Sequence, residues 1–116
     1  KSILAQNSSI ALAQFGKWHV GGDESTPNDN GWPHFEGTLS NVDSYMDWTK
    51  VTNGQTSQSK VYATTEITNN AIAWISSQQS ANKQYFAWVA YHAPHEPLHA
   101  PPSSLHARTL ADTVPR

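Results

Sequence analysis

Three stretches of the chain have a hydrophobic pattern that predicts a secondary-structure element. Residues 10–15 (IALAQF) are a short apolar run that ends at Gly16, which is typical of a buried strand, although the run alone leaves a helix open. Residues 65–79 repeat apolar side chains every three or four positions, which predicts an amphipathic helix. Its expected apolar face consists of Ile67, Ala71, Trp74, Ile75 and Gln78. Residues 85–91 (YFAWVAY) are continuously apolar and aromatic, which favours a strand covered on both faces, as in a parallel sheet.

The segments between these elements have the composition of loops and short strands. Residues 21–33 are rich in Gly, Pro, Asn and Asp and are expected to form a loop. Residues 34–63 carry aromatic side chains in a polar setting, which indicates short strands and loops. Thr64 or Thr65 is expected to cap the helix. Four prolines between positions 94 and 102 exclude regular structure there.

The order of elements is a strand, a long segment of loops and short strands, a helix and a second strand, which predicts an α/β fold. In such folds, ligands bind in the crevice beyond the carboxyl ends of the strands. Lys17 and His19 directly follow the first expected strand, and His92, His95 and His99 follow the second. Both groups of candidate residues are therefore expected at the same edge of the sheet.

Composition narrows the class of protein. Charged residues make up 14% of the 116 residues, against about 25% in an average soluble protein. The net charge is -2 with no basic run, so binding of nucleic acid through a charged surface is not supported. No stretch approaches the roughly 20 apolar residues that span a bilayer, and the lack of cysteine removes a disulfide framework and a cysteine nucleophile. The only methionine is Met46, so residues 1–116 are expected to be an internal fragment of a longer protein.

Lys17 and His19 are the first candidates for chemistry. In an extended segment, two side chains at this spacing point to the same side, about 6.5–7 Å apart. An ammonium beside an imidazole makes an anion site with a group that titrates near neutral pH. The alternative is a surface lysine and histidine on either side of a core tryptophan, Trp18.

The histidines at positions 92, 95 and 99 are the second group. Helical spacing would place them on one face like zinc ligands, but Pro94 and Pro97 argue against a helix. A loop that gathers them is one alternative, and solvent-exposed loop histidines are the other. Neutral imidazole suits zinc, copper or iron rather than calcium.

The tryptophans and acidic residues give weaker indications. Trp74 and Trp88 are expected in the core, whereas Trp32 and Trp48 are candidates for a carbohydrate surface. His34 and His106 have no arranged partner in the sequence and are expected to be structural or exposed. Four acidic side chains show no paired arrangement and are expected on the solvated surface; these are Asp23, Glu24, Asp43 and Asp47.

Several of these segments resemble the sulfatases, which are members of the alkaline phosphatase superfamily. Residues 16–21 (GKWHVG) resemble a family signature, and residues 90–98 (AYHAPHEPL) resemble the family's strand and A-P-H-x-P loop. Residues 31–37 (GWPHFEG) and 62–65 (YATT) are similar to two intervening family segments and come in the same order. The resemblance implies part of an alkaline-phosphatase-like mixed or parallel sheet flanked by helices.

The resemblance also implies roles for three residues. Lys17 matches the lysine that contacts the sulfate and the nucleophile, and His19 matches the histidine that hydrogen-bonds the nucleophile. His95 matches the histidine near the ester oxygen, a candidate acid for the leaving group. A fixed ammonium stabilises the charge of a sulfuryl group in transfer, and protonation of a leaving group is general acid catalysis. The implied activity is hydrolysis of sulfate esters, with sulfated carbohydrates among the candidate substrates.

The chain departs from the family in the nucleophile and the metal. No Cys or Ser here stands in the C/S-x-P-x-R segment that matures to formylglycine, and the aspartates and asparagine that hold calcium are not recognisable. The formylglycine and the Ca²⁺ ligands are therefore expected outside this chain, and the chain alone is expected to be inactive. Members of the family are often exported, which implies a periplasmic or extracellular protein.

Two other functions stay open. A phosphonate or phosphodiester hydrolase of the same superfamily has a similar lysine and histidine pair. A non-catalytic module that binds sugar or metal through its tryptophans and histidines belongs to another class.

Overall fold

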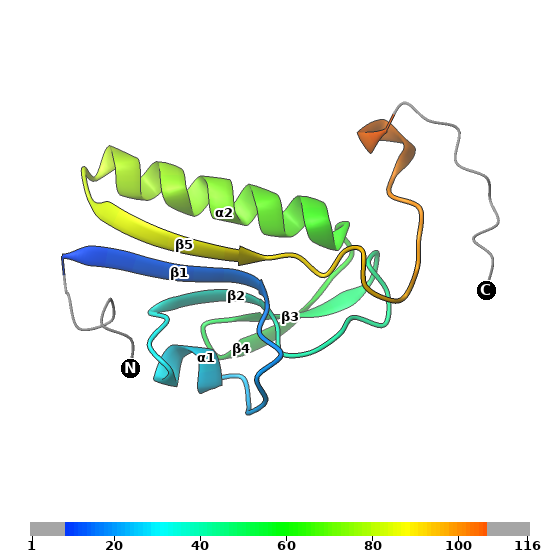
Figure 1. The fold of residues 1–116 in the computed structure, drawn as a ribbon, viewed down its shortest axis with the longest axis horizontal. Helices are drawn as coiled ribbons and strands as arrows, with labels where there is room; N and C mark the ends of the chain where they lie inside the picture. The colour runs from blue at the N-terminus through cyan, green and yellow to red at the C-terminus, as the bar shows by residue number, and fades with distance from the viewer. Residues whose placement is uncertain (1–8, 107–116) are drawn as a thin grey trace.

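The computed structural model describes residues 9–106, which form one five-stranded sheet with a long helix on one side (Figure 1). The strands lie in the order β4-β3-β2-β1-β5. Their bounds are Ile10–Lys17 (β1), His34–Thr38 (β2), Trp48–Thr52 (β3), Gln55–Ser59 (β4) and Gln84–Ala90 (β5). The helices are α1 (Thr26–Asp29), α2 (Ala63–Ser80) and the 3-10 turn η2 (Ser103–Leu105). No helix in this part of the chain is long and apolar enough to cross a membrane.

The centre of the sheet is parallel and its far side is antiparallel. β1 pairs in parallel with both β2 and β5, and β2, β3 and β4 continue as antiparallel neighbours. The carboxyl ends of β2, β1 and β5 consequently meet at one edge of the sheet, on the right in Figure 1. The predicted α/β class and the mixed sheet are confirmed.

Helix α2 lies along the sheet and closes the core. Ile67 and Ala71 are buried, and the ring of Trp74 meets that of Phe15 edge-on at 6.1 Å between centroids. The predicted helix and its apolar face are confirmed, but the predicted cap is wrong. The helix begins at Ala63, two residues before the expected start, with Tyr62 as an N-cap that makes no side-chain capping bond. The amide of Ala63 instead donates to the carbonyl of Tyr45 at 2.8 Å, which takes over the role of a cap.

Strand β5 is confirmed as a parallel strand, but the expectation that both of its faces are covered is wrong. β5 is an edge strand of the described sheet. Trp88 is 54% exposed, so its predicted place in the core is also wrong. The run YFAWVAY is apolar enough for a central strand, and nothing among residues 9–106 covers its outer side.

Two expectations about loop residues also need correction. Trp48 begins β3 and is 2% exposed, with its indole N–H donating to the carbonyl of Val61 at 2.9 Å. Trp48 is therefore a core residue, and its expected place on an exposed loop is wrong. Residues 21–33 contain the single helical turn α1 within the expected loop, because Pro27 is well suited to the first turn of a helix.

The carboxyl ends of the three parallel strands approach one another unusually closely. A Cβ atom on Gly16, whose φ is +91°, would lie 2.0 Å from the carbonyl oxygen of Ala90 in β5. A Cβ on Gly37 in β2 would lie 1.8 Å from the carbonyl oxygen of Gly16. Only glycine fits at these two positions, and this close packing sets the positions of Lys17 and of the segment after Ala90.

A partly buried ionic cluster joins the sheet to α2. The ammonium of Lys50 lies 3.0 Å from a carboxylate oxygen of Glu36 and 2.8 Å from one of Glu66. The amide of Asn70 on α2 also donates to Glu36, at 2.6 Å. The imidazole of His34, 3.9 Å away, and the ammonium of Lys50 hold the pKa of the Glu36 carboxyl below its usual range, against the opposite effect of burial. His34 is thus structural, as expected.

Candidate active site

Lys17 is the last residue of β1 and lies at the edge where the parallel strands end. It is in register with Thr38, the last residue of β2. The Lys17 ammonium donates to the side-chain oxygen of Asn41 at 2.5 Å, and Asn41 belongs to the loop that follows β2. An ammonium has three protons, so this bond orients Lys17 while leaving donors for an anionic ligand.

His19 lies two residues further on, where the chain leaves the sheet. The amides of Trp18 and His19 donate to the carbonyls of Thr38 and Leu39, both at 2.9 Å, so the segment continues alongside the loop after β2. The extended geometry expected through His19 is wrong, because its φ is +53° and β1 ends at Lys17. The rule for alternate residues of a strand therefore does not apply to this pair, and His19 is exposed.

His92 is the buried histidine of the second group, with 6% of its surface exposed. Its Nε2 lies 2.6 Å from the hydroxyl oxygen of Thr38, and that hydroxyl donates its proton to the carbonyl of Ser40 at 2.6 Å. Since a hydroxyl has one proton, the imidazole must be the donor toward Thr38, which places the proton of the neutral ring on Nε2. The segment after β5 is thereby fastened to the end of β2.

His95 lies on the outer part of the same loop, and its ring is exposed. Its backbone is held at both ends: its amide donates to the carbonyl of His92 at 2.8 Å, and its carbonyl accepts the hydroxyl of Tyr45 at 2.8 Å. Its Nδ1 lies 3.1 Å from the carbonyl of Glu96, which favours a proton on Nδ1. The other nitrogen, Nε2, is then the one without the proton in the neutral ring.

The three histidines do not assemble into a metal site. His99 stacks on Tyr45 at 3.8 Å between ring centroids, and its Nε2 lies 2.8 Å from the hydroxyl of Tyr62. No group of three or more potential metal-binding side chains occurs among residues 9–106. Calcium prefers six to eight oxygen ligands, and the described residues do not supply such a set. The ligands implied by the resemblance remain an expectation for residues outside the chain.

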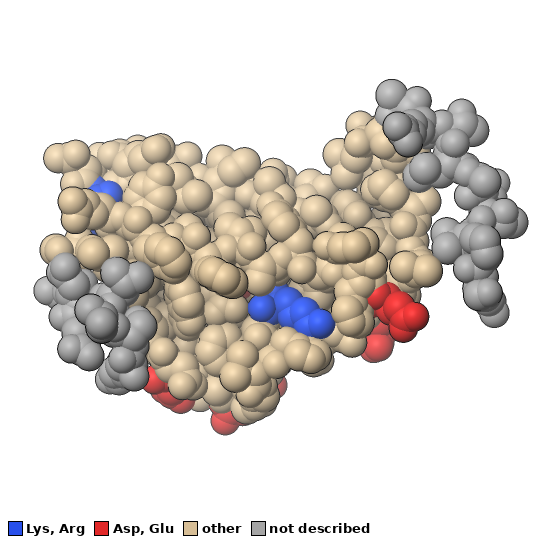
Figure 2. Space-filling model, in the orientation of Figure 1, with Lys and Arg blue, Asp and Glu red and all other residues tan. Residues whose placement is uncertain are grey.

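Electrostatics show that the two groups of candidates are close enough to influence one another. Burial lowers the pKa of His92, and the positive charges of Lys17 and His95 lower it further, while the backbone of Ser40 opposes them. The imidazole of His92 therefore stays neutral near pH 7. Uncharged side chains cover most of the face shown in Figure 2, with basic groups limited to small areas, so an isolated ammonium has a strong local effect.

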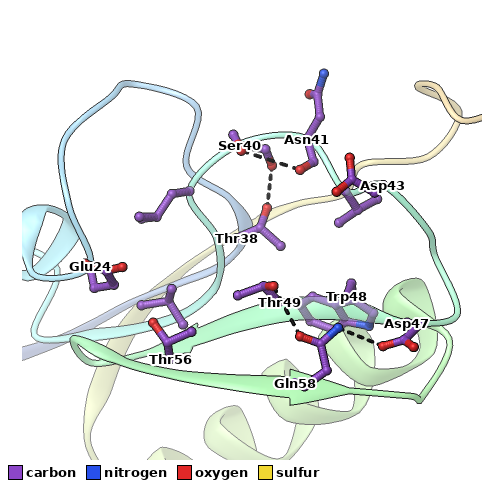
Figure 3. A pocket seen from close by; sticks show the side chains of 13 residues that line it. Glu24, Thr38, Ser40, Asn41, Asp43, Asp47, Trp48, Thr49, Thr56 and Gln58 are labelled. Atoms are coloured by element: carbon purple, nitrogen blue, oxygen red, sulfur yellow. Dashed lines mark hydrogen bonds between the residues drawn. The ribbon is translucent and has the colours of Figure 1, made fainter.

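Two hollows border this edge of the sheet. One of about 300 Å³ contains His95 and is largely apolar, with Tyr62, Pro94, Leu98 and His99 among its lining residues. The other, of about 280 Å³, lies between the loop after β2 and the β3–β4 hairpin (Figure 3). Glu24, Asp43 and Asp47 line this second hollow. All three are exposed, which confirms the expectation that they lie on the surface.

The residues that hold the candidates in place were not found from the sequence. Thr38, Asn41 and Tyr45 support His92, Lys17 and His95 respectively. They come from the segment between the two motifs, where the sequence shows only polar and aromatic residues without a period. Thr38 ends β2, and Asn41 and Tyr45 lie in the loop between β2 and β3, which no pattern in the sequence marks as part of a site.

Comparison with known proteins identifies a related fold. The chain is similar to the crystal structure of the PsFucS1 sulfatase from Pseudoalteromonas sp., with a TM-score of 0.61 and 16% sequence identity. The match covers 81% of this chain and 26% of that chain, so this chain spans about a quarter of the length of that sulfatase. No family model and no curated protein sequence matches the chain. The chain therefore has a sulfatase-like α/β fold.

Proposed function

We propose that the chain is part of a sulfatase, a hydrolase of sulfate esters, and that Lys17 and His95 form the side of its active site that binds the ester. The observation that carries the proposal is that Lys17, at the end of β1, and the segment with His92 and His95, after β5, meet where the parallel strands end. The end of β2 and the loop after it bond to both, because Asn41 accepts from Lys17 and Thr38 contacts His92. The sulfatase-like fold and the motifs GKWHVG and APHEP support the same assignment.

Lys17 supplies fixed positive charge for the sulfuryl oxygens. The negative charge on these oxygens persists through transfer, and an ammonium that is already oriented by Asn41 stabilises it without reorganisation. Lys17 therefore acts in both binding and catalysis.

His95 gives a proton to the leaving oxygen. Its backbone is fixed by His92 and Tyr45, so the ring is carried by a well-positioned segment although it is exposed. With Nδ1 facing the carbonyl of Glu96, the protonated ring presents Nε2–H to the ester oxygen. His19 is proposed as the hydrogen-bond partner of a nucleophile from outside the chain, and no step is assigned to residues that the chain lacks.

Two alternatives make different predictions. A phosphodiester or phosphonate hydrolase would use the same ammonium, because both groups carry anionic oxygens. A non-catalytic module would bind sugar or metal without hydrolysing an ester. The sulfatase-like fold and the motifs GKWHVG and APHEP favour the catalytic role over such a module.

The test begins with the gene. The DNA on both sides of the segment for residues 1–116 should be sequenced, and the complete gene product should be assayed on sulfate monoesters, phosphodiesters and phosphonates. We expect an upstream C/S-x-P-x-R segment and preference for sulfate esters. Preference for phosphodiesters or phosphonates would identify a hydrolase of those substrates instead. Absence of hydrolysis would favour the non-catalytic binding module.

His95 has a test of its own. Replacing it by Asn should slow hydrolysis of alkyl sulfates far more than that of nitrophenyl sulfate, because only the alkoxide needs the proton, and general acid catalysis is worth about 10²–10⁴-fold. An equal loss with both leaving groups would assign His95 a role in positioning instead.

A further inference from the structure

The hollow between the loop after β2 and the β3–β4 hairpin has a composition that selects among ligands (Figure 3). Its volume is about 280 Å³, which is the size of a single sugar ring or a similar small unit. Buried apolar side chains, Val42, Trp48 and Val51, lie among the lining residues, and polar side chains surround them. The hollow thus combines apolar surface with several hydrogen-bonding groups, as sites for small organic ligands do.

The polar groups are hydroxyls, amides and carboxylates. Thr49 and Thr56 project from the hairpin. Glu24, from the segment after β1, and Asp43 and Asp47, from the loop between β2 and β3, lie around the hollow. Neither lysine, arginine nor histidine is among the residues that line it. Carboxylates accept hydrogen bonds from hydroxyl groups but repel anions, so the lining suits an uncharged, hydroxyl-bearing unit and opposes an anionic one.

The carboxylates of Asp47 and Glu24 lie on opposite sides of the hollow. The Asp47 carboxylate accepts the side-chain amide of Gln58 at 2.7 Å, and Gln58 in turn accepts the hydroxyl of Thr49 at 3.2 Å. This chain of bonds orients one side of the hollow. Figure 3 shows Glu24 on the opposite side, so negative charge faces the hollow from both directions.

The hollow shares a wall with the proposed ester site. Thr38 and Asn41 both belong to its lining. Thr38 is the partner of the buried His92, and Asn41 accepts the bond from Lys17. A ligand that binds its anionic group at Lys17 therefore has this hollow on the other side of one short loop.

We infer that this hollow binds an uncharged, hydroxyl-bearing unit of the substrate next to the unit that carries the ester, and that Glu24, Asp43 and Asp47 reject a unit with a second anionic group. The inference rests on the proposed function, in which Lys17 holds the ester. It makes the protein selective for a polyhydroxylated substrate with an uncharged neighbour rather than for a densely sulfated one.

The experiment uses the complete gene product labelled with ¹⁵N and four probes: inorganic sulfate, lactose, lactose with one sulfate, and lactose with one sulfate on each sugar unit. Lactose should shift the amide signals of Thr49 and Thr56, and monosulfated lactose should also shift those around Lys17. The disulfated sugar should bind about tenfold more weakly than the monosulfated sugar. This difference should shrink as salt rises from about 0.1 M to about 1 M, since the Debye length falls from about 10 Å to about 3 Å.

A double variant and a control outside the lining separate the outcomes. The double variant Glu24→Gln with Asp43→Asn keeps side-chain shape and should bring the affinity for disulfated lactose close to that for monosulfated lactose. Asp29→Asn removes one charge outside the lining and should leave the difference in place. An equal change with Asp29→Asn, or no shift at Thr49 and Thr56 with any sugar, would overturn the inference. If inorganic sulfate leaves the signals around Lys17 unmoved, it is the proposed function that fails.

Discussion

The Nε2 atom of His92 lies 2.6 Å from the hydroxyl oxygen of Thr38, and this contact joins the segment after β5 to the end of β2. Both side chains are buried, with 6% and 4% of their surfaces exposed. Because the Thr38 hydroxyl gives its proton to the carbonyl of Ser40, the contact also fixes the tautomer of the imidazole. The loop with His95 and the loop with Asn41 are therefore held by one buried pair.

Removing the hydroxyl of Thr38 should destabilise the protein. Thr38→Val keeps the shape of the side chain but leaves the Nε2–H of His92 buried without its acceptor, which should cost about 1–3 kcal/mol. The free energy of unfolding, measured with urea, is the readout. Thr38→Ser retains the hydroxyl and serves as the control; a similar loss in both variants would show that the hydrogen bond is not the cause.

The stability of the protein should fall in mild acid. Burial, then Lys17 and His95, lower the pKa of His92 from 6.5, so the folded protein keeps this ring neutral where the unfolded chain protonates it. The unfolded state then binds more protons, and stability drops as pH falls below about 6.5, by up to about 1.4 kcal/mol per pH unit, until the folded pKa is passed. The readout is the free energy of unfolding at a series of pH values from about 7.5 to about 5.

The variant His92→Asn identifies the source of that pH dependence. It should be less stable than the natural chain at neutral pH, and its stability should change less over the same range of pH. Most carboxylates stay ionised in this window, since their usual pKa values lie near about 4. An unchanged slope in the variant would assign the effect to other groups.

The close packing at Gly16 predicts a severe effect of a single methyl group. Gly16→Ala places Cβ against the carbonyl of Ala90 and also puts an alanine at a φ of +91°. Its free energy of unfolding should fall by at least about 2 kcal/mol more than that of a variant whose alanine has the unfavourable φ but no clash. Gly21→Ala is that matched control, because its φ is +83° and no atom lies within 4 Å of the added Cβ. Thermal unfolding of the two variants is the comparison, and equal losses would contradict the packing described for the strand ends.

The ionic cluster beneath α2 should depend on its single cation. Lys50→Met leaves the carboxylates of Glu36 and Glu66 partly buried without their counter-ion, which should cost about 2–4 kcal/mol. Combining Lys50→Met with Glu36→Gln should restore part of the loss, because one uncompensated charge is removed. Urea unfolding of the single and double variants measures the coupling, and simple additivity of the two losses would contradict a shared cluster.

The elements with a strong local pattern were predictable, and the contacts between them were not. The continuous apolar run of β1 reflects burial on both faces of the strand, and the period of α2 reflects one buried face. In both cases a single segment carries the signal. The run of β5 predicts its strand but not its exposure, because the position of a strand in the sheet is a property of the other strands. Trp48 was misplaced since its polar neighbours in sequence conceal a site that α2 and the segment before it bury.

The candidate site shows the same division. Lys17 and His95 were predicted from motifs, and the structure leaves their roles as proposals while showing that both charges reach His92. The left-handed backbone at His19 was missed, because a non-glycine residue there gives no sign in sequence. The hollow beside the site was missed as well, since its lining comes from segments that are far apart in the sequence, around Glu24, the loop between β2 and β3, and the β3–β4 hairpin.

The measurement that tests the central claim most directly is release of sulfate from a sulfate monoester by the complete gene product and its Lys17→Met variant. Lys17→Met keeps the length of the side chain and removes its charge, so we expect kcat/KM to fall by at least about 10²-fold while the fold is retained. Lys17→Arg should recover part of the activity, because the positive charge remains although its geometry differs. Natural activity with Lys17→Met, in a protein that does hydrolyse the ester, would contradict the assignment of this edge of the sheet as the sulfate site.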